Sequence, residues 1–281
     1  MLRTTAKQPI DAEALSLEEK HERLKGILAG LGSVVVAYSG GVDSTLLLKV
    51  ALDVLGPTRV LAVTADSETY PTRERREARE TAELLGAPHR IVETSELAVP
   101  GYAENNRDRC YFCRHNLFEY LLPIAGELGY DHVVYGLIAD DLGDFRPGVR
   151  AAIERGVRGP LQEALLAKGE VRELSRRLGL PTWNKPALAC LSSRVAYGER
   201  ITKEKLEMID RAEELIRGLG FDQVRVRIHG DVARIEVPAE EIPRLIESRQ
   251  KVVQALRSYG CRFVTVDLAG YESGSMNRSL A

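Results

Sequence analysis

Residues 33–55 read SVVVAYSGGVDSTLLLKVALDVL, and this stretch decides the fold. The run over 33–38 is rich in β-branched residues and predicts a buried strand. Residues 45–55 are apolar over the length of a helix, and two glycines separate the two segments. The stretch therefore predicts a strand, a tight turn and a helix in direct succession.

The same alternation continues outward from this stretch. A capping box at Ser16 and Glu19 predicts a leading helix, because the two side chains can satisfy the first free amides of a helix. The pattern predicts further strands over 59–66, 89–94 and 132–137 and helices over 73–86 and 114–128. Strands that alternate with helices indicate an α/β fold with a doubly wound parallel sheet. Ligands bind such sheets at the carboxyl ends of the strands, where Ser39, Asp66 and Asp140 fall.

The pattern changes near residue 200. We expect a helix over 203–218, a β-hairpin over 224–237, a helix over 239–257 and a strand over 263–268. These elements predict a smaller α+β domain. The expected division is therefore an ATP-binding domain over 1–199 and a small substrate or oligomerisation domain over 200–281.

Composition limits the classes of function. The chain has 281 residues, of which 44% are hydrophobic, and its 39 Lys and Arg nearly balance 41 Asp and Glu, for a net charge of -2. There is no overall positive field for a nucleic acid, so we expect no nucleic-acid partner. The sequence shows neither an apolar run long enough to span a membrane nor a signal peptide, so we expect a cytoplasmic protein without a membrane partner. The chain has four cysteines, and a reducing compartment does not favour disulfides between them. Where cysteines cluster, they indicate metal binding or redox chemistry instead.

The turn between the first strand and helix has the composition of a phosphate-binding loop. Backbone amides and the positive end of the helix would converge on an anion such as pyrophosphate. The sequence has no lysine in the position that a Walker loop requires, so cleavage between the β and γ phosphates is not favoured. The simpler alternative is an ordinary glycine-rich turn. The candidate ATP-binding residues are Ser39, Gly40, Gly41, Val42, Asp43 and Ser44.

Three cysteines form the second candidate site. Cys110 and Cys113 are spaced Cys-x-x-Cys, and Cys190 lies in a distant loop. Three thiolates can hold a [4Fe–4S] cluster with one iron open, which suits delivery of sulfur. Alternatively, Cys190 is a nucleophile or a consumed sulfur donor with Arg194 lowering its pKa, or the cysteines are structural. Cys261 precedes a strand, and we expect it to be a buried core residue.

An acidic segment, GLIADDLGDFRPG over 136–148, follows the strand 132–137. Asp140, Asp141 and Asp144 are candidate Mg²⁺ ligands. Arg146 is a candidate for a bidentate contact with a phosphate or carboxylate. A solvated acidic loop is the alternative.

The hexapeptide SGGVDS resembles the signature of the N-type ATP pyrophosphatases, whose members include GMP and NAD synthetases and tRNA thiolation enzymes. The resemblance implies an adenine nucleotide alpha hydrolase-like fold and cleavage of ATP between the α and β phosphates with Mg²⁺. The products would be an adenylate and pyrophosphate. It also implies that Asp66 and Ser67 lie near the adenosine.

Five segments together resemble the LarE family of pyridinium-3,5-biscarboxylate mononucleotide sulfur synthases: SGGVDS, RCYFC, ADDLGDFRPG, NKPALACLSSRVAYGERIT and GYESGSMN. The resemblance implies that ATP adenylates a carboxylate of this nucleotide substrate and that sulfur displaces AMP. The product would lead to the nickel cofactor of lactate racemase. The family includes members that consume one cysteine and members with three cysteines and a [4Fe–4S] cluster, and this chain resembles the latter. Sulfur would come from inorganic sulfide or a donor protein, and the enzyme would be a homo-oligomer.

The acceptor carries a phosphate and two carboxylates, so its site needs cations. Ser193 and Arg194 lie beside Cys190, and Arg225 and Arg227 face one side of a strand at positions i and i+2. A solvated sheet face is the alternative for the strand pair. Only the family resemblance implies that Glu213 binds the substrate, since on sequence alone it lies on an exposed helix face. We expect Asp43, Cys190 and Arg194 to be catalytic. The competing functions are a tRNA thiolase and a non-catalytic module that binds ATP and an Fe–S cluster.

Overall fold

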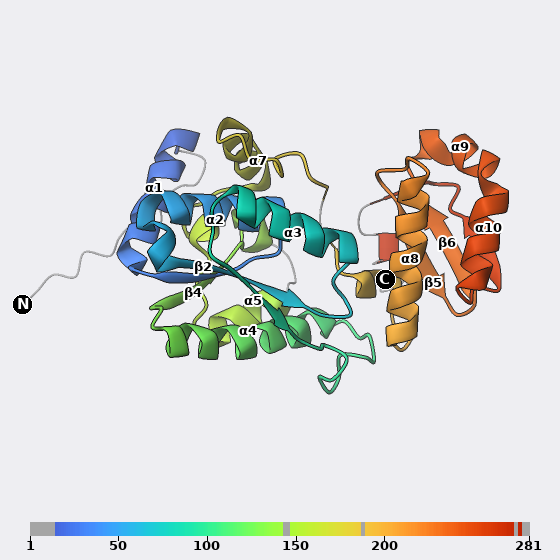
Figure 1. The fold of residues 1–281 in the computed structure, drawn as a ribbon, viewed down its shortest axis with the longest axis horizontal. Coiled ribbons are helices and arrows are strands. Elements are labelled where there is room, and N and C mark those ends of the chain that lie inside the picture. The colour runs from blue at the N-terminus through green and yellow to red at the C-terminus, as the bar shows by residue number, and fades with distance from the viewer. Residues whose placement is uncertain (1–14, 143–146, 187–188, 273–274, 277–281) are drawn as a thin grey trace, which may run out of the picture.

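A computed structural model describes residues 15–142, 147–186, 189–272 and 275–276. Figure 1 shows a larger α/β unit, which contains the N-terminal half of the chain, and a smaller unit with α8, α9 and α10. The smaller unit lies at one end of the larger one. The loops that join them meet at the edge where α3 begins.

The larger unit is built on a parallel sheet in the order β3-β2-β1-β4. Its strands are β1 (Val34–Ala37), β2 (Val60–Asp66), β3 (His89–Glu93) and β4 (His132–Tyr135). The chain passes from β1 to β3 in one direction and then crosses to β4 on the other side of β1. The carboxyl ends of the neighbouring strands β1 and β4 therefore form the switch point, where α/β sheets bind ligands. The predicted fold is confirmed.

Helices cover both faces of this sheet (Figure 1). One layer packs α1, α2, α6 and α7 together, and α4 with α5 forms the other layer. No helix in the described ranges is both long and apolar enough to cross a membrane. The helices of this unit, including short 3-10 turns, are α1 (Leu17–Leu31), α2 (Val42–Leu55), η2 (Pro57–Arg59), α3 (Thr72–Leu84), α4 (Arg109–Leu128), η3 (Ala139–Leu142), α5 (Pro147–Glu154), α6 (Pro160–Glu163), α7 (Lys168–Arg177) and η4 (Leu191–Arg194).

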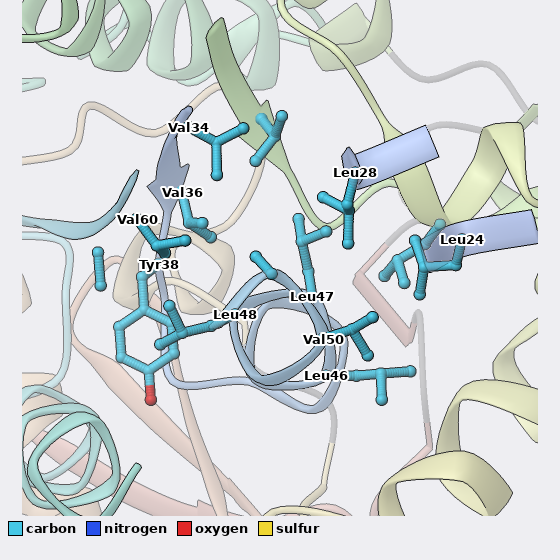
Figure 2. Close-up of a cluster of buried hydrophobic side chains, with 14 of the residues drawn as sticks. Leu24, Leu28, Val34, Val36, Tyr38, Leu46, Leu47, Leu48, Val50 and Val60 are labelled. Atoms are coloured by element: carbon cyan, nitrogen blue, oxygen red, sulfur yellow. The ribbon is translucent and has the colours of Figure 1, made fainter. Parts of the chain in front are cut away.

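A hydrophobic core fixes the orientation of β1 and α2. Figure 2 shows that leucines on several sides of α2 point toward β1 and toward Leu24 and Leu28 of α1. All the side chains of β1 are buried because α1 and α2 cover one face of the strand and α4 covers the other. This burial stabilises the strand and helix whose junction forms the SGGVDS turn.

The smaller unit contains a three-stranded sheet in the order β5-β6-β7, with an antiparallel and then a parallel pair. The predicted hairpin is confirmed. The single helix predicted over 239–257 is wrong, because α9 begins at Ile242 with Pro243 in its first turn and Ser248 separates it from α10. The elements are α8 (Lys203–Gly218), β5 (Arg225–His229), β6 (Val232–Glu236), η5 (Ala239–Glu241), α9 (Ile242–Glu247), α10 (Arg249–Ser258) and β7 (Phe263–Val266).

The core of the smaller unit includes residues from the larger one. Leu191 and Val195, which precede the predicted boundary at 199, pack into this core, and Tyr102 joins them from the loop after β3. Cys261 is buried there as expected. The two units therefore share hydrophobic contacts around the segment that carries Cys190.

Candidate active site

The SGGVDS turn connects β1 directly to α2. The helix begins at Val42, three residues earlier than predicted, so Asp43 and Ser44 lie in its first turn. The Ser44 hydroxyl accepts a hydrogen bond from the backbone N–H of Ser39 at 3.2 Å, which closes the turn. The first-turn amides of α2 have no partner within the helix and are directed toward this turn, as an anion site requires.

Two glycines let other elements approach the turn closely. Gly40 has φ +62°, and a Cβ there would lie 2.7 Å from the Cβ of Ala78 on α3. Gly136 follows β4, and a Cβ on it would lie 3.0 Å from the backbone nitrogen of Ser44. The turn is thus held between α3 and the end of β4, at the switch point of the sheet.

Asp43 is paired with a cation that the sequence did not reveal. Lys168, the first residue of α7, places its Nζ 2.8 Å from both carboxylate oxygens of Asp43. The backbone N–H of Lys168 donates to Asp140 at 2.7 Å. Asp43, Lys168 and Asp140 therefore form a charged row beside the turn, although the sequence separates Asp43 and Lys168 by 125 positions.

The carboxyl end of β2 supplies the other expected nucleotide contacts. Asp66 pairs with Nη1 of Arg75 on α3 at 2.5 and 2.7 Å. The hydroxyl of Ser67 contacts that of Thr69 at 3.1 Å. Both residues lie at the same edge of the sheet as the SGGVDS turn, because parallel strands end on one side.

Cys110 and Cys113 lie in the first turn of α4, which begins five residues earlier than predicted. Their i, i+3 spacing puts them on one side of that helix. The charge of Cys190 raises the pKa of both Cys110 and Cys113, and the charge of Cys110 also raises that of Cys113. The structure thus brings Cys190 to the pair on α4, although 77 residues separate Cys190 from Cys113 in the sequence.

A buried carboxyl group connects the thiols to the end of β2. Burial raises the pKa of Cys113, and the carboxylate of Glu96 raises it further. The Sγ of Cys113 lies 3.9 Å from Glu96, whose other oxygen accepts a hydrogen bond from Thr69 at 3.3 Å. Glu96 is buried, and sequence reasoning gave it no role. A chain of contacts from Ser67 through Thr69 and Glu96 to Cys113 therefore joins the nucleotide end of the sheet to the cysteines.

Arg194 and Glu213 form a buried ion pair. The Nε of Arg194 lies 2.9 Å from Glu213, and Nη1 donates to the backbone carbonyl of Cys190 at 2.9 Å. Burial opposes ionisation of Glu213, but Arg194 and Arg217 outweigh it and hold the pKa of Glu213 at about 2. The expectation of an exposed helix face for Glu213 is wrong, since its side chain is 1% exposed. Arg194 thereby orients the loop that carries Cys190.

Arg225 and Arg227 are buried, so the alternative of a solvated sheet face does not hold. Burial and the nearby charge of Arg194 lower the pKa of Arg225 to about 10, and the side chain stays charged at neutral pH. Arg227 pairs with Glu236 at 2.9 Å and donates to the backbone carbonyl of Ser193 at 3.1 Å. The hydroxyl of Ser193 in turn bonds the Cys190 carbonyl at 2.8 Å. Arg227 therefore supports the segment around Cys190.

A cleft lies between the two units and is rich in cations. Its walls come from the start of α3, from the segment before Cys190 and from α8 and β5. Arg194 and Arg225 of the expected acceptor site both line it. The lining residues are Pro71, Arg73, Glu74, Glu77, Lys185, Pro186, Ala189, Arg194, Arg217, Asp222, Gln223 and Arg225.

The acidic segment is described only in part. Asp140 and Asp141 lie in η3, and both accept backbone hydrogen bonds, from Lys168 at 2.7 Å and from Ile138 at 3.1 Å. Asp144 and Arg146 lie outside the described residues. In the described part of the chain, no three His, Cys, Asp or Glu side chains are already arranged to hold a metal ion.

Lys168 and Lys185 were missed for different reasons. Lys168 lies in a helix that the sequence pattern did not predict. Lys185 belongs to the quoted segment NKPALACLSSRVAYGERIT, where it was given no role. The signal for Lys185 was its position close before Cys190.

Comparisons with known proteins agree with this geometry. The NAD synthase family profile matches residues 20–116, which include the SGGVDS turn. The chain is 48% identical to an uncharacterized protein of Synechocystis sp., over 94% of this chain and 99% of the relative. It is 29% identical to an NH(3)-dependent NAD(+) synthetase of Hyperthermus butylicus, over 88% and 90% of the two chains.

A further relative identifies the family. The chain is 42% identical to the pyridinium-3,5-bisthiocarboxylic acid mononucleotide synthase of Lactiplantibacillus plantarum, over 94% of this chain and 96% of the relative. Together with the NAD synthase-like sheet and loop, this similarity makes the protein an ATP-dependent enzyme. The chain belongs to the family of pyridinium-3,5-bisthiocarboxylic acid mononucleotide synthases, the LarE family.

Proposed function

We propose that this enzyme adenylates a carboxylate of pyridinium-3,5-biscarboxylic acid mononucleotide and replaces AMP with sulfur, in the biosynthesis of the nickel-pincer nucleotide cofactor. The sulfur would arrive through a [4Fe–4S] cluster from inorganic sulfide or a donor protein. The observation that carries the proposal is that Cys110, Cys113 and Cys190 come together between the carboxyl end of β2 and a cleft lined by cations. The name of the Lactiplantibacillus relative supports the choice of substrate.

The SGGVDS turn would hold the phosphates of ATP. Its amides and the start of α2 would stabilise the charge that develops on pyrophosphate as the bond to the α-phosphate breaks. Asp43 would help to bind Mg²⁺, together with Asp140 and Asp141 or water. Lys168 now occupies both oxygens of Asp43, so we expect its ammonium to move to the phosphates when Mg²⁺ and ATP bind.

The cleft would hold the anionic acceptor. Its phosphate and carboxylates need several cations, and Arg194, Arg217 and Arg225 line one wall. Arg194 is already neutralised by Glu213, so its main effect would be to fix the carbonyl of Cys190 and the shape of the site. The acceptor would then be bound between the ATP loop and the thiols, where it can react with each in turn.

The three thiols would hold the iron–sulfur cluster after their side chains reorient, since no group of the described residues is already arranged for a metal. The three thiols come from the start of one helix and from one loop, and the charge of Cys190 acts on both Cys110 and Cys113. Arg109 is buried beside them, and the charges of Cys110 and Cys190 act on it, so a cation is available to offset thiolate charge. When bound through Cys110, Cys113 and Cys190, a [4Fe–4S] cluster with one open iron would supply a position for hydrosulfide. Sulfur that attacks the acyl adenylate forms a carbon–sulfur bond, and AMP leaves.

Anaerobic reconstitution with iron and sulfide tests this proposal. We expect about four irons per chain and their loss in Cys110→Ala, Cys113→Ala and Cys190→Ala, with retention in the matched Cys261→Ala. The mass of the intact chain should stay unchanged after turnover with ATP and the acceptor. An iron-free chain that loses the mass of one sulfur at Cys190 would instead show that the cysteine is consumed.

The release of pyrophosphate tests the enzymatic part independently. We expect release from ATP only when the biscarboxylate nucleotide is present. Binding of ATP without any acceptor-dependent release would favour the non-catalytic module. Acceptor-dependent release with tRNA in place of the nucleotide would favour a tRNA thiolase.

A further inference from the structure

Lys185 lies where the nucleotide loop meets the cationic cleft. Its backbone is fixed from two sides, since Arg172 of α7 donates to its carbonyl at 2.8 Å and its own N–H bonds Thr182 at 2.9 Å. The side chain is 12% exposed and lines the cleft together with Arg194 and Arg225. This lysine is therefore a fixed part of the cleft.

Three oxygens surround the ammonium of Lys185: two carboxylates form ion pairs with it, and one backbone carbonyl accepts its hydrogen bond. Glu74 and Glu77 of α3 lie 2.6 and 2.8 Å from Nζ, and the carbonyl of Gly40 in the SGGVDS turn lies at 3.2 Å. Among the contacts of the described residues, Lys185 alone joins a cation of the cleft to this turn. The two carboxylates attract the ammonium as ion-pair partners, whereas the carbonyl of Gly40 is neutral and more distant.

Adenylation brings two anions together at this point. A carboxylate oxygen of the acceptor must approach the α-phosphorus of ATP, and both groups are negatively charged. Repulsion between like charges is strong in a partly buried site, so a cation between them lowers the barrier. Anionic oxygens are better acceptors than a neutral carbonyl, so they can replace Gly40 as the third partner of Lys185.

We propose that Lys185 is a catalytic residue of the adenylation step that bridges the α-phosphate of ATP and the acceptor carboxylate. This assignment rests on the proposed function. The carboxylate oxygen forms a bond to the α-phosphorus, the bond from that phosphorus to the bridging oxygen breaks, and pyrophosphate leaves with the electron pair. No proton moves, and Lys185 keeps its charge throughout while Glu74 and Glu77 hold it.

The alternative is that Lys185 has only a structural role and holds the SGGVDS turn against α3. Two substitutions separate the roles. Lys185→Met removes the charge and keeps the length of the side chain, and Lys185→Arg keeps the charge. The matched control is Lys49→Met, because Lys49 also lies in an ion pair, with Asp53 at 2.6 Å, but on the outer side of α2. Thermal unfolding and ATP affinity of all variants report whether the turn itself is intact.

The test measures acceptor binding by calorimetry with and without α,β-methylene-ATP, which cannot release pyrophosphate. In Lys185→Met we expect acceptor affinity within about threefold of wild type without the nucleotide analogue and at least about tenfold weaker with it. Acceptor-dependent pyrophosphate release should fall about 100-fold or more, with ATP affinity nearly unchanged. Lys185→Arg should recover part of the release, and Lys49→Met should match wild type.

Three results would overturn the assignment. The first is release by Lys185→Met within twofold of wild type. The second is a loss of ATP affinity and thermal stability in Lys185→Met that accounts for the whole effect and is not recovered in Lys185→Arg. A purely structural role of Lys185 predicts this result. The third is wild-type protein that neither binds the biscarboxylate nor releases pyrophosphate with it. Only this third result contradicts the proposed function, so the two failures are distinguishable.

Discussion

The ATP loop and the arginine–glutamate cluster of the smaller unit are both ionic, but they differ in burial. In the loop, Lys168 and Asp43 pair at 2.8 Å with side chains that are 36% and 27% exposed. In the cluster, Arg194 and Glu213 pair at 2.9 Å with side chains that are 2% and 1% exposed. The same kind of contact therefore has different consequences in the two places.

A half-exposed pair is worth little to stability and can exchange partners, because water solvates either charge when the pair opens. A buried pair cannot open without leaving a desolvated charge. The loop is thus suited to release Asp43 for Mg²⁺ and Lys168 for phosphate during turnover. The cluster is suited to hold the Cys190 loop in one position. Substitutions in the cluster should therefore affect the fold, and substitutions in the loop should affect the reaction.

The largest effect is expected from Glu213→Ala. The substitution leaves Arg194 buried without its carboxylate and removes an acceptor from the N–H of Val226 at 3.1 Å. We expect the free energy of unfolding to fall by about 3–5 kcal/mol, measured by urea denaturation. The control is Glu173→Ala, which removes the surface partner of Arg176 and Arg177 and should leave the urea midpoint unchanged. Equal urea midpoints for Glu213→Ala and Glu173→Ala would contradict the expected difference between a buried and an exposed ion pair.

The complementary change in the loop is Asp43→Asn. We expect acceptor-dependent pyrophosphate release to fall about 10²–10³-fold, because the loop loses a charge that stabilises the transition state through the metal. The free energy of unfolding should change by less than about 1 kcal/mol, since the pair with Lys168 is half exposed. Asp53→Asn on the same helix removes the partner of Lys49 and should keep full activity. A stability loss as large as that of Glu213→Ala would contradict the distinction.

Acid should weaken the cluster in a defined direction. The pKa of Glu213 is about 2 in the folded protein and near 4.5 when unperturbed. A depressed pKa means that its stabilisation is complete above about pH 4.5 and is lost as the pH falls toward 2. The loss is on the order of 3 kcal/mol. The difference in unfolding free energy between wild type and Glu213→Gln should therefore shrink over this range, and a constant difference would show that Glu213 does not titrate with folding.

Local signals predicted the sheet and the loop, because a buried strand followed by a glycine turn and a helix is encoded within 23 adjacent residues. Lys168 could not be found in this way, since its partner Asp43 is far away in the sequence and only the sheet order brings them together. Glu213 did carry a signal. It continues the apolar stripe of Leu206, Ile209 and Ile216 at helical spacing, so a charge there had to be buried and paired.

The smallest expected effect comes from added side-chain volume in the loop, with no change of charge. Gly40 and Gly56 both have positive φ, +62° and +78°, so an alanine is strained at either position. A Cβ at Gly56 would meet nothing within 4 Å, whereas one at Gly40 would lie 2.7 Å from the Cβ of Ala78. We expect Gly40→Ala to lower the free energy of unfolding by about 1–2 kcal/mol more than Gly56→Ala.

Ala78→Gly in the Gly40→Ala background removes the nearer of two clashing atoms, the Cβ at 2.7 Å, and leaves the Cα at 2.8 Å. A urea denaturation cycle of the two single variants and the double variant measures this partial relief. Recovery toward the stability of Gly56→Ala would mean that the loop tolerates exchange of its charges but not displacement from α3. This is the behaviour expected if α3 fixes the backbone that binds phosphate while the side chains rearrange around it. Additive losses would mean that the side chain of Ala78 does not hold the loop, and that the contact with the backbone of α3 at 2.8 Å decides its position.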